Sequence, residues 1–231
     1  MPVLALDTSA AVAVALIGDD GATLASRMVH EQRRHAEQLA PMIAEVLAAT
    51  GTDRTALTAV VVGTGPAPFT GLRVGLVTAR ALGLALSIPV HGVCALDAIA
   101  AQAVADLALA DRAEVLVVTD ARRREVYWAR YRVCRAADPA AVELVAGPGV
   151  ASAAQVAADG HADGAVVVGR GAGLYPDALR SAEGAPVDPD PAVLARLALA
   201  RSAHGEELPT APLYLRRPDV MPPAGHKRAL A

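Results

Sequence analysis

The sequence predicts an α/β protein built from two units in tandem, each with the element order βββαβαβα. Short apolar runs that read as strands are interleaved with segments that carry apolar residues at helical spacing. A similar order restarts near residue 110, in a more degenerate form and without a repeat of the amino acids themselves. We therefore expect an N-terminal unit at residues 1–109 and a C-terminal unit at residues 110–231.

The composition indicates a folded protein without a global attraction to polyanions. Of the 231 residues, 54% are hydrophobic, and the formal net charge is −3. Any contact with nucleic acid therefore needs a local patch or another subunit. The two cysteines, Cys94 and Cys134, match no metal or redox spacing. The first strand has no cationic start and the apolar runs look too short for a membrane span, so we expect a cytoplasmic protein without a membrane partner.

Three short strands are expected first, at Val3–Asp7, Ala11–Ile17 and Thr23–Val29. A helix is expected at His35–Ala48, because an apolar stripe recurs there at helical spacing: Leu39, Met42, Ile43, Val46 and Leu47. The other side of this helix carries an alanine at every fourth position: Ala36, Ala40, Ala44 and Ala48. The helix can therefore pack on two sides.

The next elements are a strand at Val60–Gly63 and a helix at Gly71–Leu86, joined by a loop rich in proline and glycine. The helix has a small residue at every fourth position: Gly71, Gly75, Ala79 and Gly83. An interior glycine costs about 0.5–1 kcal/mol relative to alanine. This ridge therefore predicts that a helix of a partner packs closely against it. A strand at Val90–Val93 and a helix at Leu96–Leu109 complete the unit.

The elements of the second unit follow the same signals. We expect strands at Val115–Thr119, Glu125–Val133, Val142–Val145 and Ala165–Val168, and helices at Val150–Ala158 and Pro191–His204. The Asp138-Pro139 and Gly147-Pro148-Gly149 segments read as loops, and residues 218–231 read as a loose tail.

The loop before the second helix does not match a phosphate-binding P-loop. Gly71 is followed by Leu72, with no lysine to reach a phosphate, and Pro66 and Pro68 each remove a backbone donor. We predict a rigid strand-to-helix turn in which Thr70 caps the helix. The glycine-rich segment at residues 169–173 also lacks the spacing of a dinucleotide-binding loop.

Metal-ligand and nucleophile patterns are weak. His30 and His35 are five residues apart, and the position four residues after His35 is Leu39, which cannot bind a metal. We expect neither a metal site nor a catalytic residue in this chain. Polar residues after the first strand are candidates for contacting a nucleotide, although a polar turn is the commoner explanation: Asp7, Thr8 and Ser9.

A basic segment with aromatic residues lies between two expected strands. Residues 120–130 read Asp-Ala-Arg-Arg-Arg-Glu-Val-Tyr-Trp-Ala-Arg, a composition that could contact a phosphate backbone. We favour a hairpin turn with its charges in water and with Tyr127 or Trp128 packed inward. Direct RNA contact through residues 122–132 stays open as an alternative.

Five segments carry a family resemblance over nearly the whole chain. They are Leu4–Ser9, His35–Leu39 before Pro41, Pro66–Gly75, Asp120–Tyr127 and Pro212–Arg216. In this order they closely resemble the TsaB family, also called YeaZ, which takes part in making threonylcarbamoyladenosine in tRNA. One departure is in the loop, where Ala67 and Pro68 replace the glycine and serine common in the family. These residues stiffen the turn and weaken the case for a nucleotide contact through backbone donors.

The resemblance implies the actin/Hsp70-like (ribonuclease H-like) fold with two βββαβαβα subdomains. It also implies that the transfer reaction belongs to a paralogous partner, TsaD, whose equivalent helix carries a His-x-x-x-His metal pair, and that an ATPase, TsaE, joins the complex. In this chain the second histidine of that pair would fall on Leu39. We therefore expect no cofactor on this chain alone, with ATP used by the TsaE-like subunit and a metal ion by the TsaD-like subunit.

We accordingly expect a non-catalytic scaffold subunit that binds and activates a TsaD-like transferase, meets tRNA through the complex and forms a homodimer in isolation. The two helices that carry small residues would make the dimerisation interface, with these residues in contact: His35, Leu39, Ala40, Ile43, Ala44, Leu47, Gly71, Leu72, Gly75, Leu76, Ala79 and Gly83. Substituting Gly75→Leu or Ala40→Glu should then block partner binding while the fold stays intact.

Two enzymatic alternatives remain open from the sequence. One is a metal-dependent peptidase-like enzyme or acyltransferase of the same superfamily. The other is a nucleotide-binding ATPase, suggested by Asp7 and by the glycines at residues 169–173.

Overall fold

The computed structural model describes residues 2–30, 35–134 and 142–216, so the expected Asp138-Pro139 loop and the tail at residues 218–231 lie outside the described residues. The strands are β1 (Val3–Asp7), β2 (Val12–Ile17), β3 (Thr23–Val29), β4 (Ala59–Gly63), β5 (Val90–Val93), β6 (Glu114–Arg122), β7 (Glu125–Val133), β8 (Val142–Ser152) and β9 (Ala165–Val168). The helices are α1 (His35–Thr50), α2 (Phe69–Leu86), α3 (Ala95–Asp106), α4 (Ala153–Ala158), α5 (Arg170–Leu174) and α6 (Pro191–Ala203), with a 3-10 turn, η1, at Arg54–Ala56.

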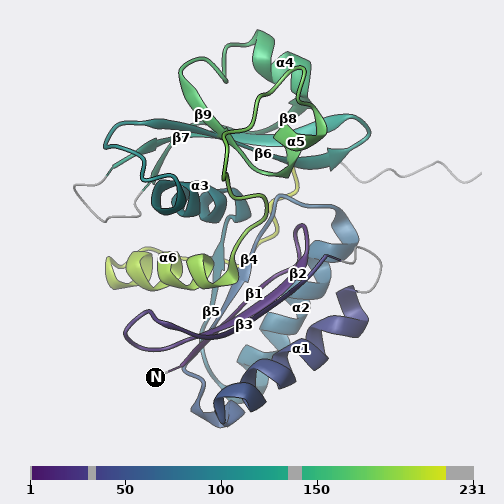
Figure 1. Cartoon of the computed structure of the whole chain (residues 1–231). Helices are drawn as coiled ribbons and strands as arrows, with labels where there is room; N and C mark the ends of the chain where they lie inside the picture. Colours follow the sequence, from purple (N-terminus) through teal and green to yellow (C-terminus); the bar gives the residue numbers. More distant parts are fainter. Residues whose placement is uncertain (1, 31–34, 135–141, 217–231) are drawn as a thin grey trace, which may run out of the picture.

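These strands form two mixed sheets, one in each expected unit (Figure 1). The first sheet has the order β3-β2-β1-β4-β5, and the second has the order β8-β7-β6-β9. In the first sheet β1 runs antiparallel to β2 and parallel to β4, so that Leu4 lies between Leu16 and Val60. The parallel pairs β1–β4 and β4–β5 are joined through helices, as such connections require.

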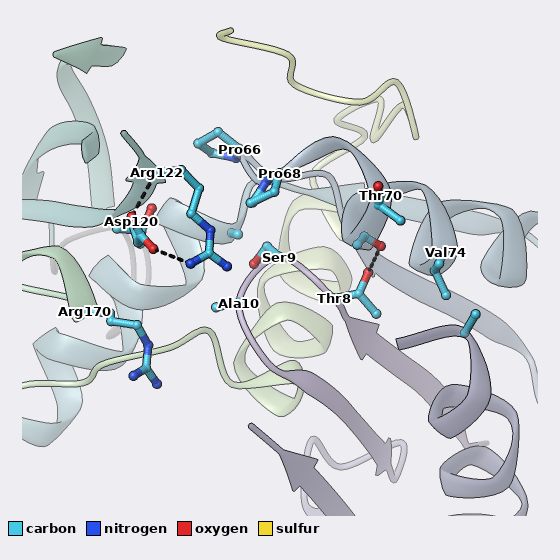
Figure 2. A pocket seen from close by; sticks show the side chains of 14 residues that line it. Thr8, Ser9, Ala10, Pro66, Pro68, Thr70, Val74, Asp120, Arg122 and Arg170 are labelled. Atoms are coloured by element: carbon cyan, nitrogen blue, oxygen red, sulfur yellow. Dashed lines mark hydrogen bonds and ion pairs between the residues drawn. The ribbon is translucent and has the colours of Figure 1, made fainter. Parts of the chain in front are cut away.

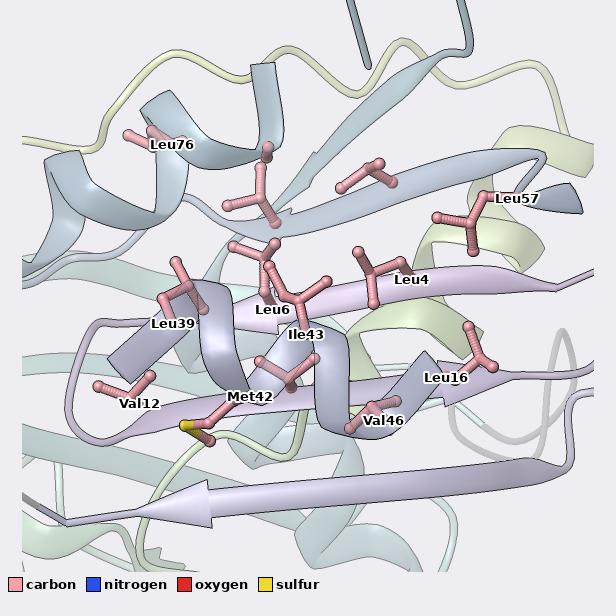
Figure 3. Packing of buried hydrophobic residues seen from close by; sticks show 14 of the residues in the cluster. Leu4, Leu6, Val12, Leu16, Leu39, Met42, Ile43, Val46, Leu57 and Leu76 are labelled. Carbon is pink, nitrogen blue, oxygen red and sulfur yellow. The ribbon is translucent and has the colours of Figure 1, made fainter. Parts of the chain in front are cut away.

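The first sheet is covered on both faces because successive residues of a strand point to opposite sides. Leu4 and Leu6 pack with the apolar stripe of α1 and with Leu76 of α2 (Figure 3). Val3 and Ala5 face the other way, in a cluster with residues of α6. Strands β1, β2 and β4 therefore read as nearly continuous apolar runs, which is typical of strands buried on both faces.

Helices α3 and α6 lie between the two sheets (Figure 1). α6 packs on the first sheet, whereas α3 contributes to the core of the second sheet. Asp97 of α3 joins the layers, because it accepts a hydrogen bond from Tyr131 Oη at 2.7 Å and pairs with Arg201 of α6 at 2.8 Å. A boundary at residues 109 and 110 thus separates the strands of the two sheets, but each of these helices packs across it.

The second sheet differs from expectation at β8. This strand runs to Ser152 and includes the Gly147-Pro148-Gly149 segment that we expected to be a loop. Gly149 pairs with Trp128 of β7, and a Cβ at Gly149 would lie 2.8 Å from the indole Nε1. The glycine leaves space for the indole instead of ending the strand, and helix α4 begins only at Ala153, three residues later than expected.

Candidate functional site

Helix α2 turns its small residues toward the chain's own first sheet. This ridge is buried throughout: Gly71, Gly75, Ala79 and Gly83. A Cβ at Gly75 would lie 2.4 Å from Thr8 Oγ1, and one at Gly83 would lie 2.2 Å from Val90 Cγ2. The glycines therefore allow α2 to lie close to the sheet of its own chain. The expectation that this ridge packs against a partner helix is wrong.

The start of α2 also differs from expectation. The residue that caps the helix is Pro68, and no side chain makes a capping hydrogen bond, so the predicted capping role of Thr70 is wrong. The hydroxyl of Thr8 instead bonds to the first turns of the helix, donating to Gly71 O at 2.8 Å and accepting from Gly75 N at 3.2 Å. An uninterrupted helix would pair these two backbone groups with each other.

Most of the expected interface residues lie in the core of this chain. The buried ones are Leu39, Ile43, Gly71, Leu72, Gly75, Leu76, Ala79 and Gly83. Leu47 is half-buried, while Ala40 and Ala44 are exposed. The side chain of His35 lies outside what the structure describes. The buried residues face inward because each helix covers the sheet with its strongest apolar stripe, a packing that propensity and spacing alone do not distinguish from contact with a partner.

The opposite sides of α1 and α2 carry exposed apolar side chains. We call this surface the helical face: Ala36, Ala40 and Ala44 of α1 with Val77, Ala81 and Leu84 of α2, which are exposed, and Val74 of α2, which is half-buried. Val77 is 63% exposed and Leu84 is 85% exposed. A groove on this face lies between α1 and α2. Ala36 of α1 lines it, together with Thr70, Arg73, Val74, Val77 and Thr78 of α2. Exposed apolar side chains gathered on one surface are one of the features by which interaction sites are recognised.

An extended segment at residues 206–216 runs along one side of α2. Thr210 accepts a hydrogen bond from Arg80 Nε at 3.0 Å. Tyr214 stacks on Phe69 with ring centroids 4.2 Å apart, and Arg73 Nε donates to Tyr214 Oη at 3.0 Å. Sequence reasoning missed this segment except for the family motif at its end, because it has no periodic apolar pattern.

A cleft of about 210 Å³ opens between the two sheets (Figure 2). Thr8, Ser9 and the Pro66–Pro68 turn line one side, and Asp120, Arg122 and Arg170 line the other. All three of these charged groups are paired, since Arg122 Nη1 lies 3.1 Å from Asp120 Oδ2 and Arg170 binds Asp188 through both of its carboxylate oxygens. The cleft is therefore polar on one side and largely apolar on the other.

The three residues expected to contact a nucleotide are placed differently from one another. Thr8 and Ser9 line the cleft, whereas Asp7 is 1% exposed and does not. Asp7 Oδ1 accepts hydrogen bonds from the backbone N–H and the hydroxyl of Ser9, at 2.8 and 2.6 Å. Burial raises the pKa of Asp7 to about 6, although the Ser9 hydrogen bonds act in the opposite direction. These contacts are those of a buried turn.

The glycine segment after β9 uses its own donors internally. Gly169 N and Arg170 N donate to Pro186 O and Val187 O, both at 2.9 Å. A Cβ at Gly169 would lie 2.3 Å from Val118 O, so this glycine is needed for close packing on β6. A short helix, α5, opens at Arg170, whose backbone N–H is the one that bonds to Val187 O.

The basic residues of the β6–β7 hairpin fall into two groups. Near the start of β6, Glu114 pairs with Arg130 and with Arg132, and Arg130 also donates to the carbonyls of Gly160, His161 and Asp163. Arg122, Arg123 and Arg124 form the exposed tip at the other end. The predicted hairpin is confirmed, with Tyr127 buried and Trp128 half-buried against His161.

By length and composition alone, α2 could cross a membrane: it has 18 residues and a mean hydropathy of 1.3. This differs from the expectation that every apolar run is too short. One such helix is weak support for a span, and in this structure α2 packs on the first sheet. Among the described residues, no three histidine, cysteine or acidic side chains group closely enough to hold a metal ion.

Comparison with protein families and sequences connects this geometry to known proteins. The family model described as TsaD, tRNA N6-adenosine threonylcarbamoyltransferase, matches residues 24–170. An uncharacterized protein of Mycobacterium tuberculosis is 43% identical over 226 residues, which cover 95% of this chain and 94% of that protein. The tRNA threonylcarbamoyladenosine biosynthesis protein TsaB of Escherichia coli is 34% identical over 132 residues, or 57% of this chain. The matches span 55% of the length of that TsaB and 56% of the length of a Mycobacterium leprae relative that is 42% identical.

Solved structures give the same result for the fold. YeaZ from Pseudomonas aeruginosa is 30% identical with a TM-score of 0.77, and the match covers 93% of this chain and 99% of that one. A second Pseudomonas aeruginosa structure, described as similar to peptidase YEAZ, is 31% identical with a TM-score of 0.78 and the same coverage. The likeness confirms the predicted α/β fold of the actin-like, ribonuclease H-like type.

Proposed function

Because this chain belongs to the TsaB (YeaZ) family, we propose that it is a non-catalytic scaffold subunit in the biosynthesis of threonylcarbamoyladenosine in tRNA. In this proposal it binds a TsaD-like transferase through the helical face and activates it. A TsaE-like ATPase would use ATP, and the TsaD-like subunit would hold the metal ion. This chain would encounter tRNA as part of the complex. In isolation the same face would pair with a second copy of the chain.

The observation that carries the proposal is the exposure of the helical face. Leu84 is 85% exposed and Val77 is 63% exposed, on a helix whose ridge of Gly71, Gly75, Ala79 and Gly83 is buried. Burying a leucine side chain is worth about 1.5–3 kcal/mol. Covering these two side chains with a partner therefore supplies a substantial part of a binding free energy.

The match to a TsaD family model supports the identity of the partner. The matched residues, 24–170, include both helices of the helical face. If partner and chain share this part of the fold, the partner carries equivalent helices, and two such faces can pack through a pseudo-twofold axis. The same reasoning gives a homodimer when the partner is absent.

An enzyme in its own right is the less favoured candidate. By the family resemblance, Leu39 stands where the transferase has its second metal-binding histidine. The Leu39 side chain is 1% exposed and packs in the core on the first sheet. A leucine there serves packing between α1 and β1 rather than ligand chemistry.

The proposal can be tested in cells depleted of this protein, by measuring threonylcarbamoyladenosine in tRNA after complementation. We expect Leu84→Asp in α2 to fail to restore the modified nucleoside. Leu24→Asp is the matched control, because Leu24 is 49% exposed on the edge strand β3, away from α2. Full restoration by Leu84→Asp would contradict the proposal.

A further inference from the structure

The tip of the β6–β7 hairpin consists of three consecutive arginines with left-handed backbone. Arg122, Arg123 and Arg124 have φ angles of 65°, 53° and 65°. Arg122 pairs with Glu125 in the ladder, so Arg123 and Arg124 are the central residues of a two-residue turn. A turn with positive φ at both central residues strongly favours Asn-Gly, because other side chains crowd the backbone there.

Packing does not explain why arginines occupy this turn. All three residues are exposed. Left-handed residues other than glycine are uncommon, and this hairpin turn has three of them in succession. The sequence thus places three guanidinium groups within one exposed turn of a chain whose net charge is −3.

The acidic groups near the tip are engaged by arginines. Asp120 pairs with Arg122, and Glu125 pairs with Arg216, which also donates to Ala121 O at 2.9 Å. Among the described residues, the tip and Arg216 bring four arginines close together, and two of them pair with Asp120 and Glu125. The other basic residues of the hairpin, Arg130 and Arg132, are held by Glu114 near the start of β6 and do not belong to this patch.

The cleft between the two sheets extends from Arg122 of the tip to the start of α2. Arg122 lines the cleft together with Thr70 and Val74 of α2, and these two residues also line the groove of the helical face (Figure 2). Arg122 and the groove of the helical face therefore border the same cleft.

We propose that the arginine tip, Arg122–Arg124, binds the phosphate backbone of RNA. This inference rests on the proposed function, because it takes tRNA as the substrate of the complex. Guanidinium groups match the geometry of phosphate oxygens, and three of them in one turn give affinity without reading the base sequence. The chain thereby contributes to RNA positioning as well as to docking.

The test measures binding of an unmodified tRNA transcript to the full chain by fluorescence anisotropy, between about 50 and 200 mM salt. The double variant Arg123→Asn/Arg124→Gly removes two charges and installs the favoured turn residues, so it should fold as well as the original chain. We expect it to weaken binding about tenfold and to reduce the slope of log affinity against log salt by about 2. Arg112→Gly is the matched control, since Arg112 is also exposed with a φ of 64° but lies before the start of β6, at the far end of the strand from the tip.

The outcomes separate this inference from the proposed function. The RNA-binding proposal would be contradicted if the double variant kept its RNA affinity and salt slope. It would also be contradicted if Arg112→Gly lost as much RNA affinity as the double variant. Capture of the TsaD-like subunit is measured in parallel, and the double variant should retain it. If Leu84→Asp fails to capture the TsaD-like subunit but still binds RNA, both the docking proposal and the RNA-binding proposal are supported. If that variant captures the subunit fully, only the docking proposal is contradicted.

Discussion

The hydroxyl of Thr8 accepts a hydrogen bond from the backbone N–H of Gly75 at 3.2 Å, and a Cβ at Gly75 would lie 2.4 Å from that oxygen. The end of β1 is thereby bonded directly into α2. The small ridge of α2 is explained by this contact within the chain, and the outer side of the helix stays available for a partner.

Substituting Gly75→Ala should destabilise the fold by about 1–3 kcal/mol, because the added methyl group has no room beside Thr8. Urea denaturation followed by circular dichroism measures this change. Gly173→Ala is the control, since nothing lies within 4 Å of a Cβ there. In the Thr8→Ala background the cost of Gly75→Ala should fall; an equal cost in both backgrounds would show that Thr8 is not the obstacle. Gly75→Leu would accordingly disrupt the fold, contrary to its expected effect on binding alone.

Asp7 should make the stability depend on pH. Its pKa is raised from 3.8 to about 6, so the folded chain holds the proton more tightly than the unfolded chain. Its contribution to stability is therefore fully present below about pH 4 and is lost as the pH rises through about 6. Asp7→Asn removes this loss. The free energy of unfolding of the variant, taken relative to that of the original chain, should therefore rise by up to roughly 3 kcal/mol between pH 4 and pH 8. Denaturation at both pH values measures the gain, with the exposed Asp106→Asn as a control for surface charge; a constant difference would contradict the account.

Arg130 should be structural, unlike Arg132. Arg130 bonds to Glu114 and to the carbonyls of Gly160, His161 and Asp163, so Arg130→Ala leaves several partners without a donor. We expect a loss of about 2–3 kcal/mol. The Arg132 side chain is 43% exposed and pairs with Glu114, so Arg132→Ala should cost less than about 1 kcal/mol. Thermal denaturation of the two variants checks this order, and equal effects would argue against it.

The strands and helices were largely predictable because their signals are local. The stripe of α1 from Leu39 to Val46 and the apolar runs of β1 and β4 have the expected positions and burial. The direction in which Gly75 and Gly83 face was not predictable, since spacing shows that a helix has a bare ridge but not which neighbour fills it. The place of Gly149 in a strand was not predictable for a similar reason. The glycine leaves space for the indole of Trp128, which comes from a different strand.

Ala40→Glu should weaken partner binding without unfolding the chain, as expected from the sequence. Ala40 is exposed on α1, so a longer charged side chain is tolerated by the monomer but would be buried at the interface. Size-exclusion chromatography of the co-expressed pair measures the loss. Glu45→Ala, at another exposed position of α1, tests whether any change on this helix has the same effect.

The most direct measurement is the affinity of the purified chain for the TsaD-like subunit by isothermal titration calorimetry. Leu84→Asp should lower the affinity at least about tenfold, since burial of a leucine is worth about 1.5–3 kcal/mol and about 1.4 kcal/mol corresponds to a factor of ten. The melting temperature should stay unchanged, because Leu84 is 85% exposed in the monomer, and Leu24→Asp should bind as the original chain does. Equal affinity of Leu84→Asp and the original chain would contradict docking through the helical face.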